Sequence, residues 1–344
     1  MERNMFTLVN LTKIYKQIKK PQISIWDKLI AKEVTKNTTK FEVQTKSAGR
    51  LRAPLVSARE KGVFIEKEAF EVTMYQPGLI KLYTINTAES LLEQHFGQTI
   101  YAENQDNIAK KELAESMIEL RDISTRTKIW MLLTLLTTGV CPTGDGTAGV
   151  KYDKDFKQIA LTSNDTFKNP QFDIVKWVED RQNEIFKSTG IVIDSLVMAP
   201  DVVSYFLANE KVKEDQKNVN VNLIQLNQNV QRLDNGMKLV GFIPSLNITV
   251  YSYIDWAKEP GEKEETQLLP EKTIVGFKAN SFTVYYGALA LRPKQGENAQ
   301  LFVEKEIIRP FYPEASEDNE IQYFSAPLIM PEDAKGYFAA KVLE

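Results

Sequence analysis

The stretch from residue 104 to residue 138 contains neither glycine nor proline. Within it, mostly apolar side chains recur at spacings of three and four, the pattern of one face of an α-helix. Gly139 and Pro142 follow, an order that is typical of a helix end. We predict one helix of about 33 residues, roughly 50 Å long at 1.5 Å per residue. The recurring positions are Leu113, Met117, Leu120, Ser124, Thr127, Met131 and Leu135.

The last turns of this helix, residues 129–136, are almost entirely apolar and are expected to be buried on all sides. A membrane-spanning helix needs about 20 apolar residues, so this run is too short to cross a bilayer. The chain start has no apolar stretch long enough for a signal peptide. Neither a membrane segment nor a membrane partner is predicted.

The only cysteine, Cys141, and the only histidine, His95, are the obvious candidates for catalysis. A Cys-His dyad is formally possible, but a small hydrophobe at a helix end is the favoured interpretation of Cys141. One His and one Cys exclude an ordinary zinc site. The G-x-G-x-x-G at residues 144–149 follows a helix, whereas a dinucleotide fingerprint follows a strand. The sequence therefore predicts no catalytic residue, no metal and no cofactor.

Charge is unevenly distributed along the 344 residues. Residues 1–62 carry fourteen Lys and Arg against five Asp and Glu, a net charge of +9. The whole chain has a net charge of −3, so the remainder carries −12. A basic arm on an acidic body predicts contact with acidic surfaces.

The rest of the chain predicts an α+β fold. Residues 7–20 and 86–97 favour helices, the polar segment 32–40 is expected to be loose, and residues 41–85 favour a long two-stranded excursion with a basic tip. Between residues 150 and 265 we expect a compact α+β unit. Its signals are Gly190 as a helix stop, Pro200 as a helix start, and Asp234-Asn235-Gly236 as a tight turn.

Three stretches carry a resemblance to a known family: "GRLRAPLVSAREKGVFIEKEAFEVTMYQPGLIKLYTINTAESLL", "LRDISTRTKIWMLLTLLTTG" and "YFSAPLIMPEDAKGYFAAKVL". In this order they resemble the hairpin, the end of the spine helix and the closing segment of the phage lambda major head proteins. That family has the Hong Kong 97-type capsid fold. The resemblance implies an N-terminal arm, an extended hairpin loop, a peripheral domain with the spine helix, and an axial domain. The expected ranges are 1–40 for the arm, 41–85 for the hairpin, 86–149 with 267–344 for the peripheral domain (spine helix 104–138), and 150–266 for the axial domain.

The resemblance further implies a structural protein that assembles with itself, as pentamers and hexamers, into an icosahedral head enclosing double-stranded DNA. Implied partners are a scaffolding protein, a head protease, a portal and non-specifically held DNA, and the sequence leaves open whether a decoration protein is used. Assembly would take place in the host cytoplasm, and the mature location would be the virion. Contacts between subunits are expected from the arm and the hairpin, at Lys13, Lys16, Lys19, Lys20, Arg50, Arg52, Arg59, Phe64, Ile65 and Phe70.

Alternative functions were weighed against this one. An encapsulin-like nanocompartment shell has the same fold and would hold an enzyme instead of DNA. An enzyme using Cys141 and His95 is a less favoured alternative. A tail-tube protein is disfavoured because tube subunits are mostly strand, whereas this chain predicts a very long helix.

Overall fold

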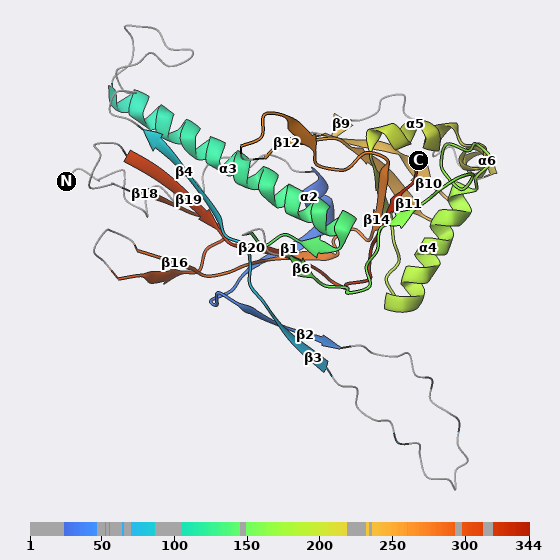
Figure 1. Cartoon of the computed structure of the whole chain (residues 1–344), viewed down its shortest axis with the longest axis horizontal. Helices are drawn as coiled ribbons and strands as arrows, with labels where there is room; N and C mark the ends of the chain where they lie inside the picture. The colour runs from blue at the N-terminus through green and yellow to red at the C-terminus, as the bar shows by residue number, and fades with distance from the viewer. Residues whose placement is uncertain are drawn as a thin grey trace.

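The computed structural model describes residues 24–46, 52, 55, 64, 70–86, 105–144, 149–218, 232–233, 236–259, 261–292, 298–311 and 319–344. Its longest element is helix α3, Gln105–Thr138, which has 34 residues and crosses much of the molecule (Figure 1). This confirms the single long helix predicted from the sequence. The predicted helix over residues 7–20 lies outside the described residues, and so does the one over 86–97 except for Asn86, which ends strand β4 (Ile80–Asn86).

One stripe of α3 contacts two separate apolar clusters. Leu113, Met117 and Leu120 pack with Ile308, Ile321 and Tyr323. Further along, every residue from Ile129 to Leu136 is buried except Trp130 and Thr134, and these buried residues belong to the main core. The helix is therefore amphipathic at first and almost wholly buried at its end, as the sequence predicts.

Gly139 ends the helix in the left-handed conformation, with φ of +74°. Its backbone N–H donates to the Leu135 carbonyl at 2.8 Å. The Phe156 ring lies so close that a Cβ at residue 139 would sit 2.5 Å from it. Glycine is thus required here by both the backbone and the packing.

The largest sheet in the described part of the chain has seven strands and lies beside three helices (Figure 1). It takes strands from both sides of residue 266, where the sequence suggested a domain boundary. The predicted helix stop at Gly190 and helix start at Pro200 are both confirmed. The strand order is β7 (Ile159–Ala160), β21 (Phe338–Lys341), β14 (Thr273–Phe277), β8 (Ser195–Met198), β11 (Ile248–Tyr253), β10 (Met237–Ile243) and β9 (Arg232–Leu233); the helices are α4 (Ile174–Thr189), α5 (Pro200–Ala208) and α6 (Glu210–Asn218).

Two three-stranded sheets flank α3 within the described ranges. The first is formed by β1 (Ile30–Thr35), β15 (Phe282–Tyr286) and β20 (Pro327–Pro331), and the second by β18 (Ile307–Phe311), β19 (Asn319–Ser325) and β4 (Ile80–Asn86). The two-stranded pairs are β2 (Phe41–Lys46) with β3 (Phe70–Tyr75), β5 (Val140–Cys141) with β6 (Val150–Lys151), β12 (Trp256–Lys258) with β13 (Glu265–Gln267), and β16 (Leu289–Leu291) with β17 (Gln300–Phe302).

The expectation that the polar segment 32–40 is loose is wrong for its first residues. These residues are not loose, because β1 pairs in parallel with β15, from Ile30 opposite Phe282 to Thr35 opposite Tyr286. The pairing continues into the next segment, where the Lys36 N–H donates to the Tyr286 carbonyl. The short helix α2 (Ser24–Leu29) precedes β1 and buries Ile25, Trp26 and Leu29 in the main core. The polar sequence misled because the partner strand lies about 250 residues away.

Replacing Gly139 with alanine should lower the free energy of unfolding by about 1–3 kcal/mol, because the variant must hold φ > 0 and push the Phe156 ring aside. Urea denaturation followed by circular dichroism would measure the change. Gly241→Ala is the matched control, since a Cβ there meets nothing within 4 Å. Equal stability of Gly139→Ala and the control would refute the assigned role of Gly139.

Candidate assembly surfaces

The ribbon formed by β2 and β3 projects from the body of the subunit (Figure 1). The two strands pair antiparallel, from Phe41 opposite Tyr75 to Lys46 opposite Phe70. Only the base of the ribbon is fixed to the body by ring contacts in the described residues. Phe41 is buried, with its ring centroid 6.0 Å from that of Tyr285, and the Tyr75 centroid is 5.4 Å from that of Tyr152.

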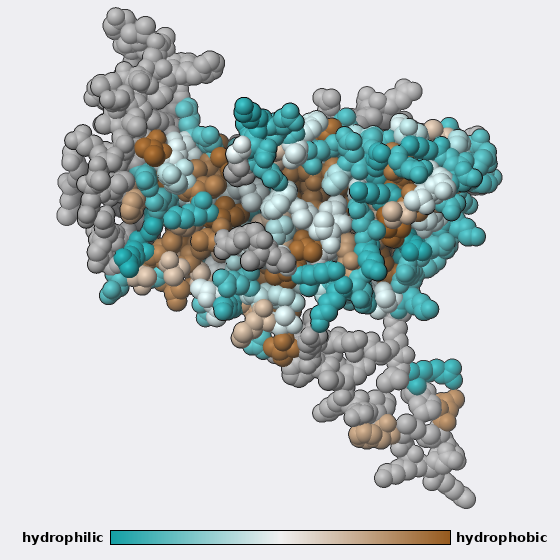
Figure 2. Space-filling view, in the orientation of Figure 1, coloured by the Kyte–Doolittle hydropathy of each residue, from teal (hydrophilic) through white to brown (hydrophobic). Residues whose placement is uncertain are grey.

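The opposite face of the ribbon presents apolar side chains to solvent. Met74 is 70% exposed and Val72 is 47% exposed, and Glu42 lies opposite Met74 on the same face. Phe64 is 87% exposed. Both brown and teal side chains can be seen on this projecting part in Figure 2. A two-stranded ribbon with apolar side chains in water is marginally stable, so this face is a candidate contact surface.

The structure describes only part of the predicted contact set. Arg52 and Phe64 are exposed, and Phe70 is the first residue of β3. The other seven predicted residues, Lys13, Lys16, Lys19, Lys20, Arg50, Arg59 and Ile65, lie outside the described residues. The assignment of these ten residues to contacts between subunits stays a prediction.

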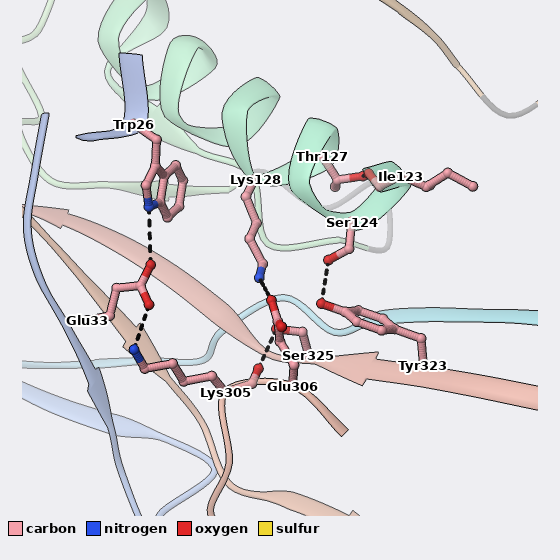
Figure 3. Close-up of polar contacts among 10 residues, drawn as sticks. All are labelled: Trp26, Glu33, Ile123, Ser124, Thr127, Lys128, Lys305, Glu306, Tyr323 and Ser325. Carbon is pink, nitrogen blue, oxygen red and sulfur yellow. Dashed lines mark hydrogen bonds and ion pairs between the residues drawn. The ribbon is translucent and has the colours of Figure 1, made fainter. Parts of the chain in front are cut away.

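A buried ion pair lies against the second half of α3 and was not predicted from the sequence (Figure 3). The Lys128 ammonium is 2.6 Å from a Glu306 carboxylate oxygen, and their side chains are only 7% and 14% exposed. The same ammonium lies 5.2 Å from the centre of the Tyr286 ring. One turn earlier, the Ser124 hydroxyl donates to the Tyr323 hydroxyl at 2.8 Å. The sequence signal that could have indicated this pair is a lysine one turn after Ser124, beside the mostly apolar stripe of the helix.

A second ion pair lies next to the first, because Lys305, which precedes Glu306 in the chain, pairs with Glu33. Lys305 Nζ lies 2.7 Å from Glu33 Oε2, and Trp26 Nε1 donates to Glu33 Oε1 at 3.1 Å (Figure 3). Burial raises the pKa of Glu33, but the hydrogen bond and charge of Lys305, with smaller effects from Trp26 and Lys128, outweigh it and hold the pKa below its ordinary value. Glu33 is therefore ionised at neutral pH.

The candidate catalytic residues do not form a site in the described residues. Cys141 is fully buried, and burial raises the pKa of its thiol to about 12, so it is a thiol and not a nucleophilic thiolate at neutral pH. His95 lies outside the described residues. No group of three or more His, Cys, Asp or Glu in the described ranges is arranged to hold a metal. Of the helices whose positions are described, none is long and apolar enough to span a membrane.

Solved structures define the fold. A proposed prophage capsid protein from E. coli CFT073 matches with a TM-score of 0.66 and 12% identity, over 98% of this chain and 99% of that one. A phage-related protein from Bordetella bronchiseptica RB50 matches with a TM-score of 0.50 and 11% identity, over 98% and 97%. The capsid of cyanophage P-SCSP1u matches with a TM-score of 0.50 and 6% identity, over 95% and 90%. The chain has the Hong Kong 97-type capsid fold, with α+β composition.

The family is defined by sequence. A family model described as "Phage major capsid protein E" matches residues 7–342. The chain therefore belongs to the phage major capsid protein E family. No curated protein sequence matches the chain. The chain is accordingly a structural capsid protein of a phage or prophage virion and not an enzyme, and family membership favours this function over an encapsulin shell.

The buried ion pair predicts an asymmetric response to mutation. Lys128→Gln should cost about 3–5 kcal/mol of unfolding free energy, because the buried Glu306 carboxylate would lose the charge of Lys128. The double variant Lys128→Met/Glu306→Leu should be much closer to the wild type, since it removes both charges. Chemical denaturation measures both variants.

An ion pair on the surface serves as a control that separates the effect of burial on stability from the effect of losing a charge. Lys278 and Glu332 are 3.6 Å apart with side chains 42% and 59% exposed. Lys278→Gln should change stability by at most about 1 kcal/mol. A Lys128→Gln effect no larger than that of Lys278→Gln would contradict the importance of the buried pair.

Proposed function

We propose that this capsid protein forms pentamers and hexamers that close into an icosahedral head around the double-stranded DNA of a tailed phage or prophage. The observation that carries the proposal is the match to the major capsid protein family over residues 7–342. Membership of that family implies self-assembly into a shell. The arrangement of the subunits as pentamers and hexamers is our proposal. The projecting ribbon supplies a means of joining adjacent copies.

The ribbon is proposed to dock its exposed face on an adjacent subunit. Met74, Val72 and Phe64 are apolar side chains that the described part of the subunit leaves exposed. Burying one such side chain fully contributes roughly 1.5–3 kcal/mol. Even partial burial of these side chains at each of many identical contacts would strongly favour the assembled state.

Arginines near the ribbon tip are proposed to fix the register of this contact. Arg50, Arg52 and Arg59 can each form bidentate pairs with carboxylates. The rest of the chain, beyond residue 62, has an excess of twelve negative charges and offers many such acceptors. Apolar burial would supply the attraction, and the arginine pairs would supply the specificity.

The basic arm is proposed to contact the acidic body of a neighbouring subunit or a scaffolding protein. Packaged DNA is the rival partner. However, an arm that gripped the genome tightly would resist its release, so we favour the protein partner. A head protease and a portal are the further partners proposed for assembly.

The two ends of the molecule are proposed to occupy different places in a capsomer. The seven-stranded sheet with α4, α5 and α6 would lie at the local symmetry axis. The sheet of β18, β19 and β4, with the first half of α3, would lie at the periphery. In this proposed arrangement, the ribbon would lie between neighbouring copies.

Removing the ribbon tip should block assembly without unfolding the subunit. We expect a chain lacking residues 50–62 to remain folded by circular dichroism but to form no closed shells in negative-stain electron microscopy. Val72→Ser/Met74→Ser should weaken assembly in the same way, while changing unfolding free energy by no more than about 0.5 kcal/mol. Glu262→Ser/Glu264→Ser, in an exposed loop, is the control and should assemble normally. Unfolding of the monomer by the deletion would show that the ribbon belongs to the subunit's own core.

Neutralising the arm should impair assembly in a salt-dependent manner. Lys13, Lys16, Lys19 and Lys20 replaced together by Gln should reduce shell yield with scaffold present. The wild type should show the same loss when salt rises from 0.1 M to 1 M, as the screening length falls from about 10 Å to about 3 Å. Normal shells that differ only in DNA retention would instead identify DNA as the partner of the arm.

A further inference from the structure

Strand β1 is attached to the body mainly through its backbone and two side chains, Ile30 and Glu33. It pairs in parallel with β15 at the edge of its sheet, and the register shifts between Ile30 and Lys32. A strand that pairs on one side only and carries an irregularity is held less firmly than a central strand. Ala31, Lys32 and Thr35 are exposed, and of the β1 side chains only Ile30 packs against the main core.

The segments on either side of β1 are anchored much more firmly. Before it, α2 buries Ile25, Trp26 and Leu29 in the main core. After it, Phe41 is buried at the base of the ribbon. β1 is therefore a weakly held link between two apolar anchors, and it leads directly into the ribbon.

Glu33 is the side chain that ties β1 to its surroundings. Its two carboxylate oxygens contact Lys305 and Trp26, at 2.7 Å and 3.1 Å. Lys305 is held in turn, because its backbone carbonyl accepts a hydrogen bond from the Ser325 hydroxyl at 2.8 Å. The partner of Glu33 is thus fixed to β19, a strand of the neighbouring sheet (Figure 3).

The next residue, Glu306, binds α3 instead. Its carboxylate contacts Lys128 at 2.6 Å, so two consecutive residues form ion pairs with two different elements. The four charges alternate in sign, Glu33, Lys305, Glu306 and Lys128, and sum to zero. Such a chain can transmit a displacement of β1 to α3, since moving Lys305 also moves its covalent neighbour Glu306.

We propose that the Lys305-Glu306 dipeptide is a charge clamp that couples the strand leading into the ribbon to the spine helix, and that acid releases β1 from it. This goes beyond the proposed function, because it concerns a single subunit and holds whether or not the ribbon contacts a neighbour. The clamp gives the shell-forming ribbon and the long helix a shared point of attachment.

The sign of the acid effect follows from the charges around Glu33. Lys305 and Lys128 favour its ionised form, while Glu306 and the Tyr286 hydroxyl are the other titratable groups nearby in the described residues. Because the folded-state pKa of Glu33 is lowered below 4.5, its contribution to stability is complete at neutral pH. It is lost as pH falls through that lowered pKa, so release belongs to the range below pH 4.5.

Amide hydrogen exchange on the full-length chain tests the clamp. Glu33→Gln should raise exchange at residues 31–35 by roughly tenfold or more at neutral pH, because a charge-assisted contact is lost. The amides of β14, residues 273–277, should keep their protection. The wild type should show the same selective loss in protection factors below pH 4.5, and Glu33→Gln should show a smaller additional change. Unchanged exchange of β1 in Glu33→Gln, or equal acceleration in β14, would overturn the proposal.

Charge reversal separates the ion pair from a general packing effect. Glu33→Lys and Lys305→Glu should each deprotect β1, and the double reversal should restore part of the protection, because it restores the ion pair but a lysine at position 33 cannot accept the Trp26 hydrogen bond. The same reversals at the exposed Lys278 and Glu332 pair are the matched control and should leave β1 unchanged. Failure of the double reversal to restore any protection would count against a clamp made by charge.

Coupling to α3 needs a variant that does not touch β1. Glu306→Gln should also raise exchange at residues 31–35, by at least a few-fold, although Glu306 contacts Lys128 and not Glu33. If Glu306→Gln leaves β1 unaffected in a chain whose β14 remains protected, the two ion pairs act independently. The coupling half of the proposal would then be wrong.

Discussion

The rest of the fold depends on one constraint, that a single stripe along α3 must be buried by two different cores. Near its start the stripe packs on the sheet of β18, β19 and β4, and near its end it enters the main core beside β5 and β21. A helix of 34 residues is rigid enough to hold these two regions at a fixed separation. The position of each strand that contacts α3 is therefore set by the part of the helix on which it packs.

Charge occupies the point where the two cores meet. Between the two apolar parts of the stripe lie Ser124 and Lys128, and they bind polar side chains that lie 199 and 178 residues later in the chain. Burying these groups unpaired would be costly, so their pairing fixes the positions of β19 and of the segment 304–306 relative to α3. An apolar residue at 128 would leave that register less firmly specified.

The sequence correctly predicted the features that depend only on residues close together in the chain. The absence of glycine and proline defined α3, and Gly139, Gly190 and Pro200 marked helix boundaries correctly because each acts through its own backbone geometry. β1 was missed because its polar residues become a strand only by pairing with β15, far along the chain. The Lys128 pair was missed for the same reason, since nothing near residue 128 reveals Glu306. The ribbon of β2 and β3 was predicted as an excursion from its β-prone residues, but the predicted range of 41–85 wrongly included β4, which pairs with β19 in the body. No residue of the chain identifies the surface that covers Met74.

The position of β21 has a consequence for the order of events in the cell. Phe338–Lys341 lies between β14 and β7, so a strand far along the chain fills an interior place in the seven-stranded sheet. A chain still on the ribosome cannot complete this sheet until those residues have emerged. Pairing between Ala340 and Ile159 also spans a long stretch of chain, which makes closure slow compared with local helix formation. Translation thus delays completion of this sheet until residue 341 has left the ribosome, whereas α3 can form much earlier.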